Sequence, residues 1–111
     1  FGGIYNGKRV THPKFTGKPN KPIQRAIQYL PYTEFIVFDI RIIDNNSNTY
    51  YVDWDKVKSI SKKVGFKYVP ELFRGTFNEC ITYSIDFITK VPKLYGLEDL
   101  KNNYAEGIII K

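Results

Sequence analysis

The clearest hydrophobic pattern of the chain lies at residues 34–43, EFIVFDIRII, where aromatic and β-branched side chains dominate. A proline precedes this segment and the polar run DNNSN follows it, so residues 34–43 are expected to form a β-strand. The Asn and Ser cluster predicts a turn, and TYYV after it is expected to return as an antiparallel strand. Alternation along the first strand places Phe38 on an isoleucine face, as a core residue by default. It places Asp39 and Arg41 together on the other face, where they can pair with each other.

The hydrophobic period changes after this hairpin. In DWDKVKSISKKVG the apolar residues recur at helical spacing, the acidic residues come early and the lysines late, and Gly65 supplies a stop. This pattern predicts an amphipathic helix. FKYVPELF is expected to be extended, and Thr76 and Glu79 have the spacing of a capping box at the start of a short helix.

The last third of the chain carries weaker signals. A further helix is expected through SIDFITKV, ending near Pro92, and LEDLKNN is expected to form a turn. AEGIIIK is then expected to return to the sheet as a strand. Strands with interposed helices and short connections predict an α+β fold, with mainly antiparallel sheets and packed helices.

Prolines and charge set the first third of the chain apart. Four prolines between residues 11 and 32 remove backbone donors and predict a long irregular loop in the first half of this stretch. The formal net charge is +6, and residues 34–111 hold eleven basic and eleven acidic side chains, so the whole excess lies before residue 34. Residues 1–33 contain no acid and six basic residues: Lys8, Arg9, Lys14, Lys18, Lys21 and Arg25. Such a segment suits attraction to a phosphate backbone or a solvated loop, and charge alone does not decide between them.

Composition bounds the class of protein. At 111 residues, 42% of them hydrophobic and 16% aromatic, the chain can form the core of one small domain or part of a larger one. It has neither a long apolar run nor a signal-peptide pattern, so nothing in it argues for membrane insertion or secretion. A lone cysteine, Cys80, suits a reducing, intracellular compartment and is expected to pack as a small apolar side chain.

Several familiar catalytic patterns are missing from the sequence. The single histidine, His12, has no neighbouring Cys or His, which argues against a zinc site and against a histidine-based catalytic dyad. Neither of the usual glycine-rich phosphate loops occurs.

The carboxyl-terminal stretch EGIIIK is unusual because charged residues bracket three isoleucines. In a regular strand Glu106 would share a face with Ile108 and Ile110, and Lys111 would lie on the opposite face. A carboxylate on an apolar face is costly to bury unless it is paired or holds a metal. The alternative is an edge strand protected by charged ends.

Four segments together resemble a known family. They are FGG at 1–3, EFIVFDI at 34–40, VGFKYVPELFRGTFNE at 64–79 and EGIIIK at 106–111. In this order they resemble the nucleotidyltransferase domain of ATP-dependent RNA ligases, and most of all the RNA ligase 2-like family, which includes the RNA-editing ligases. EFIVFDI resembles motif IIIa and EGIIIK resembles motif IV. FKYVPELFRGTFNE is close to a family-specific signature, and the resemblance covers essentially the whole chain.

The resemblance implies an activity. Enzymes of this family join RNA 3′-hydroxyl and 5′-phosphate ends: ATP adenylylates a motif I lysine, AMP passes to the RNA 5′-phosphate, and the 3′-hydroxyl then displaces AMP with the help of Mg²⁺. By resemblance, Phe38 stacks on adenine and Asp39 follows it in the nucleotide site. Glu106 and Lys111 are the implied catalytic residues, with Glu106 near the nucleotide and the metal and Lys111 near the phosphates.

The resemblance also implies what surrounds this chain. FGG resembles the end of motif III, so the motif I lysine is expected upstream of residue 1 and motif V downstream of residue 111. Residues 1–111 are therefore expected to be the central part of one nucleotidyltransferase domain, inactive by themselves. A C-terminal domain or a partner protein would complete the enzyme, and a protein that resembles the editing ligases would work in mitochondria.

Nicked or single-stranded RNA ends are the implied substrates. Within this reading, the proline-rich loop is expected to hold RNA phosphates through Lys14, Lys18, Lys21 and Arg25, because it carries the excess charge.

Three alternatives stay open at this point. A DNA ligase or an mRNA-capping guanylyltransferase would share the superfamily, although FKYVPELFRGTFNE argues against both. A noncatalytic nucleic-acid-binding domain would bind RNA through residues 1–33. In a structural fragment, Phe38 and Glu106 would only support a sheet.

Overall fold

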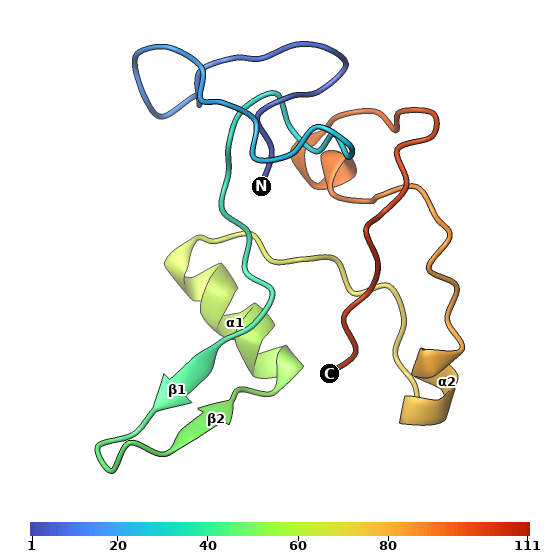
Figure 1. The fold of residues 1–111 in the computed structure, drawn as a ribbon. Coiled ribbons are helices and arrows are strands. Elements are labelled where there is room, and N and C mark those ends of the chain that lie inside the picture. The colour runs from blue at the N-terminus through green and yellow to red at the C-terminus, as the bar shows by residue number, and fades with distance from the viewer. The chain divides into compact units, whose positions relative to one another are not determined.

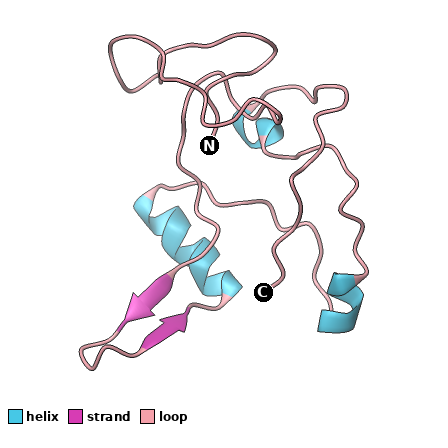
Figure 2. Ribbon diagram, in the orientation of Figure 1, coloured by secondary structure: helices cyan, strands magenta, loops and turns pink.

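The computed structural model describes residues 1–111, and its backbone divides into two compact units (Figure 1). The first unit comprises residues 1–34 and 70–110, and the second comprises residues 35–69 together with Lys111. The elements in chain order are β1 (Arg41–Ile43), β2 (Thr49–Tyr51), α1 (Trp54–Val64), α2 (Phe77–Ile81) and the 3₁₀ helix η1 (Pro92–Tyr95). Helices and an antiparallel strand pair agree with an α+β class, and most of the remaining chain is loop (Figure 2). No helix is both long enough and apolar enough to cross a membrane.

The second unit begins with the predicted hairpin. β1 pairs with β2 in antiparallel register, with Arg41 opposite Tyr51 and Ile43 opposite Thr49. In the turn, Asp44 Oδ1 accepts hydrogen bonds from the backbone N–H groups of Asn46 and Asn48, at 2.8 and 2.9 Å. Hydrogen bonds from the side chain and backbone of Asn48 lower the pKa of Asp44. The Asn and Ser cluster thus forms the expected turn because an aspartate side chain replaces backbone partners.

The strand predicted over residues 34–43 is only partly formed. Strand geometry holds for Arg41–Ile43, while further upstream Val37 makes an isolated parallel bridge to Tyr68. Between them, the backbone N–H of Ile40 donates to its neighbour's side chain, Asp39 Oδ1, at 2.7 Å. This local hydrogen bond uses a donor that a continuous ladder would need, so the strand prediction was too long.

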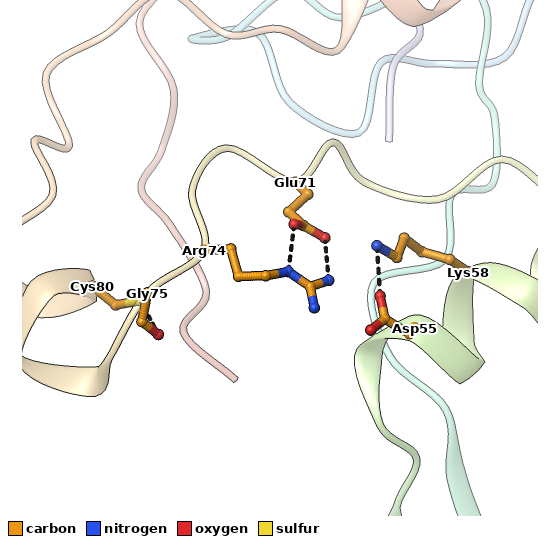
Figure 3. A network of polar contacts seen from close by, with 6 residues as sticks. All are labelled: Asp55, Lys58, Glu71, Arg74, Gly75 and Cys80. Carbon is orange, nitrogen blue, oxygen red and sulfur yellow. Dashed lines mark hydrogen bonds and ion pairs between the residues drawn. The ribbon is translucent and has the colours of Figure 1, made fainter.

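Helix α1 forms as its periodicity predicted. It runs from Trp54 to Val64 and ends at Gly65, which takes the left-handed conformation at φ 79°. Val57 is fully buried and packs with Val37 and Val52 in a small core. On the outer side Lys58 pairs with Asp55 at 2.9 Å (Figure 3).

In the first unit, the FGG segment packs against the end of the proline-rich loop. The backbone N–H of Gly3 donates to the carbonyl oxygens of Leu30 and Tyr32, both at 3.0 Å, and Leu30 is fully buried. Residues 11–32 contain no helix or strand, which confirms the irregular loop. The side-chain amide of Asn103 makes two hydrogen bonds with the backbone of Gln28. It accepts from the Gln28 N–H at 2.8 Å and donates to the Gln28 carbonyl oxygen at 2.6 Å.

Short polar contacts shape the segment ELFRGTFNE. Arg74 makes two parallel hydrogen bonds to Glu71, at 2.9 and 3.0 Å (Figure 3). Thr76 and Glu79 form the predicted capping box at the start of α2, and the hydrogen bonds from Thr76 lower the pKa of Glu79. The Cys80 thiol is half-buried and donates to the Gly75 carbonyl oxygen at 3.8 Å.

The helix predicted through SIDFITKV does not form. Ile88 instead makes an antiparallel bridge to Tyr104, and Thr89 N–H donates to the carbonyl oxygen of Asn103 at 2.9 Å. Ser84 Oγ accepts from the backbone N–H of Asp86, which favours a turn over a helix. Pro92 begins η1 instead of ending a helix, because proline suits the first helical position.

The strand predicted over AEGIIIK is also absent. Pairing with residues 87–89 ends at Ala105, whose N–H donates to the carbonyl of Phe87. Glu106 lies in a bend, and Gly107 follows with φ 154°, far from the negative φ of a β-strand. Alternation from Glu106 to Lys111 therefore does not apply, and the face assignments made for this segment were wrong.

Candidate functional site

Two of the residues singled out in the sequence meet in the second unit. Lys111 Nζ donates a hydrogen bond to Asp39 Oδ1, although 72 residues separate them, and their side chains are 22% and 18% exposed. Asp39 is thus paired with Lys111, and the pairing with Arg41 that the alternation suggested is not the one observed. The carboxylate and the ammonium group form a charge-assisted hydrogen bond that holds both side chains in place.

Trp54, the first residue of α1, completes this cluster. Lys111 Nζ lies 5.3 Å from the centroid of the indole ring, within the range of a cation–π contact. Tyr68 packs its ring edge-to-face against Trp54 at a centroid distance of 6.0 Å. Trp54 is one of the apolar residues whose helical spacing predicted α1, and no local signal in the sequence marks its contact with Lys111.

Phe38, next to Asp39 in the chain, is not a core residue. Its side chain is 55% exposed, whereas its neighbour Val37 is buried in the small core. The default core assignment was therefore wrong. An exposed aromatic face is able to stack on a planar base, which is the role that the resemblance gives to Phe38.

Glu106, in the first unit, is an exposed carboxylate with one buried partner. The hydroxyl of Tyr29 donates to Glu106 Oε2 at 3.0 Å. Burial, followed by the hydrogen bond to Glu106, raises the pKa of Tyr29 to about 12, so its hydroxyl stays protonated and keeps donating at neutral pH. Phe1 packs edge-to-face on the Tyr29 ring at 5.6 Å. The contact of Tyr29 with Glu106 could not be predicted from the sequence, because no motif or charge pattern near Tyr29 indicates it.

The acidic side chains of residues 1–111 are arranged to give a Mg²⁺ ion only one or two protein ligands. No group of three or more His, Cys, Asp or Glu side chains in residues 1–111 is placed to hold a metal ion. Mg²⁺ usually binds one or two carboxylates and takes its other ligands from water and substrate phosphates. An exposed single carboxylate such as Glu106 fits that mode.

The proline-rich loop, called the basic loop from here on, displays its charged side chains at the surface. Lys14, Lys18, Lys21 and Arg25 are all exposed. Arg9 instead folds back, and its Nη2 donates to the carbonyl oxygen of Asn20 at 2.7 Å. The four cations assigned to RNA are therefore accessible to a phosphate backbone.

Comparison with known proteins establishes the family. A family model described as RNA ligase matches residues 4–111. Over 90 residues the chain is 34% identical to "RNA-editing ligase 1, mitochondrial" of Trypanosoma brucei brucei, and equally to that of its strain 927/4 GUTat10.1. The alignment covers 76% of this chain and 19% of each relative, so the chain spans about a fifth of their length. No solved structure matches. The chain belongs to the RNA ligase family.

Proposed function

We propose that the protein containing this chain is an ATP-dependent RNA ligase. It joins RNA 3′-hydroxyl and 5′-phosphate ends through an enzyme–AMP adduct and an adenylylated RNA end. The observation that carries the proposal is the contact between Asp39 and Lys111, which come from the two segments resembling motifs IIIa and IV. A family member that brings these two segments together has the start of a nucleotide site.

Each residue then has a defined task. The exposed ring of Phe38 stacks on adenine. Lys111 contacts both the Asp39 carboxylate and the Trp54 ring, which orient its ammonium for a phosphate group. When Mg²⁺ is bound it stabilises developing charge on the phosphates. Glu106, whose carboxylate is oriented by the Tyr29 hydroxyl, is the ligand we assign to it.

The substrates and setting follow from the same proposal. Nicked or single-stranded RNA ends approach the basic loop, where Lys14, Lys18, Lys21 and Arg25 contact phosphates. Because the curated relatives are named as mitochondrial RNA-editing ligases, we place the protein in mitochondria. A C-terminal domain or a partner protein completes the enzyme.

Transfer of label from α-labelled ATP to the native protein containing this chain, with Mg²⁺, tests the proposal. We expect the wild type to form a covalent protein–AMP adduct. Phe38→Ala and Glu106→Ala should lower its rate at least tenfold, because one removes the adenine contact and the other the metal ligand. Tyr50→Ala, which truncates an exposed ring of β2, is the matched control and should act like the wild type. A folded wild type that forms no adduct would contradict the proposal.

A further inference from the structure

The basic loop carries an aromatic side chain that the proposed activity does not yet use. Phe15 is 70% exposed, which is the highest value among the exposed large hydrophobic residues of the chain. It lies between Lys14 and Lys18, both at the surface, in a segment without acidic residues. A single exposed apolar side chain is common at protein surfaces, but Phe15 is the one exposed aromatic residue of the acid-free residues 1–33, which makes it a candidate for contact with a planar, anionic ligand.

The structure holds Phe15 in a defined position. Its backbone N–H donates to the carbonyl oxygen of His12 at 2.9 Å, and its ring lies 4.9 Å from the His12 ring. His12 is itself fixed: its Nδ1 accepts from the Lys14 N–H at 3.0 Å, and its Nε2 lies 3.2 Å from Glu34 Oε2. Since Nδ1 accepts, Nε2 carries the proton that is shared with Glu34.

Two further hydrogen bonds join the two ends of this part of the loop, residues 9–20. The hydroxyl of Thr11 donates to the carbonyl oxygen of Gly17 at 2.5 Å, and Arg9 donates to that of Asn20 at 2.7 Å. A pocket opens beside the aromatic pair, and its lining includes Phe15, His12, Lys18 and Asn20. The pocket thus combines a ring face, a cation and an amide.

We propose that Phe15 is a stacking platform for an unpaired RNA base, with Lys14 and Lys18 on the flanking phosphates. Proteins bind single-stranded RNA by stacking bases on aromatic rings while basic side chains follow the backbone. Phe15 and its two lysines supply both parts within five residues. Lysines are depleted from the cores of protein interfaces, so this surface fits RNA better than a protein partner. The inference rests on the proposed RNA ligase function and deepens it, because it names the side chains that contact an unpaired stretch of the RNA.

The test is equilibrium binding of the native protein to a short single-stranded RNA that contains 2-aminopurine, and to a duplex of the same length. We expect Phe15→Ala and Phe15→Leu to weaken single-strand binding about tenfold or more, and Phe15→Trp to retain it, because stacking needs an aromatic ring. The wild type and Phe15→Trp should quench the 2-aminopurine fluorescence, and the other two variants should not. Lys18→Ala should instead reduce the slope of log K against log salt by about 0.7.

Two results would overturn the inference. One is single-strand affinity in Phe15→Leu equal to that in Phe15→Trp, since both keep a large apolar side chain. The other is an equal loss of single-strand and duplex binding in Phe15→Leu. Protein–AMP formation by the wild type, measured without RNA, tests the proposed function separately, so failure of either proposal is recognisable.

Discussion

At the scale of single residues, each of the two charged residues singled out by the resemblance contacts an aromatic side chain of its own unit. Lys111 contacts Trp54, and Glu106 accepts from Tyr29, 77 residues away in the chain. The resemblance to family motifs was enough to single out the two charged residues. Neither aromatic partner was found, because contacts between residues this far apart leave no mark on local spacing.

The raised pKa of Tyr29 predicts that the protein loses stability at alkaline pH. Burial and the hydrogen bond to Glu106 raise the pKa of Tyr29 from 10.0 in its ordinary state to about 12. The neutral hydroxyl therefore stabilises the fold fully below the ordinary pKa, and this contribution is lost as pH rises toward the folded value. Tyr29→Phe removes the titrating group, so its free energy of unfolding should fall less steeply with pH than that of the wild type.

Urea unfolding at a series of pH values from about 8 to about 11 measures this difference. Tyr51→Phe, a change at an exposed tyrosine of β2, is the control and should follow the wild type. Parallel curves for the wild type and Tyr29→Phe would show that the hydroxyl of Tyr29 is not held as described.

At the scale of elements, local signals decided which predictions were correct. Helix α1, the capping box of α2 and the β1–β2 hairpin all carry their own caps or turn residues, and each was confirmed. The segments SIDFITKV and AEGIIIK carry apolar residues without such signals, and both predictions were wrong. Their conformation depends instead on the pairing of residues 87–89 with residues 103–105 and on the backbone at Gly107, which one sequence does not reveal.

The end of α1 allows a prediction about stability. Gly65 has φ 79°, and a Cβ built there would meet no atom within 4 Å. Gly65→Ala therefore costs only the strain of a left-handed backbone, and we expect the free energy of unfolding to fall by about 1 kcal/mol. Gly65→Asn should cost less, since asparagine tolerates this conformation.

Chemical denaturation of the native protein measures both Gly65 variants. Ser59→Ala, on the exposed face of the same helix, is the control and should change stability by less than about 0.5 kcal/mol. Gly65→Ala as stable as the wild type would mean that α1 does not end in a left-handed residue.

At the scale of the whole molecule, charge is the property that the sequence predicts best. The excess of +6 arises entirely before residue 34, and the structure leaves Lys14, Lys18, Lys21 and Arg25 exposed there. Exposure of these residues was predictable because ammonium and guanidinium groups are costly to bury. Which of them face a common ligand was not predictable, because the path of a proline-rich loop depends on contacts such as that between His12 and Glu34.

Salt dependence distinguishes a specific RNA-binding loop from general attraction by net charge. Each phosphate contact to single-stranded RNA contributes about 0.7 to the slope of log K against log salt. Replacing Lys14, Lys18 and Lys21 by Ala should therefore reduce the slope by about 2. The matched control replaces Lys56, Lys62 and Lys63 of α1, three exposed lysines from the charge-balanced part of the chain. It removes the same net charge and should leave the slope nearly unchanged. Equal reductions in the two triple variants would mean that net charge, and not this loop, attracts the RNA.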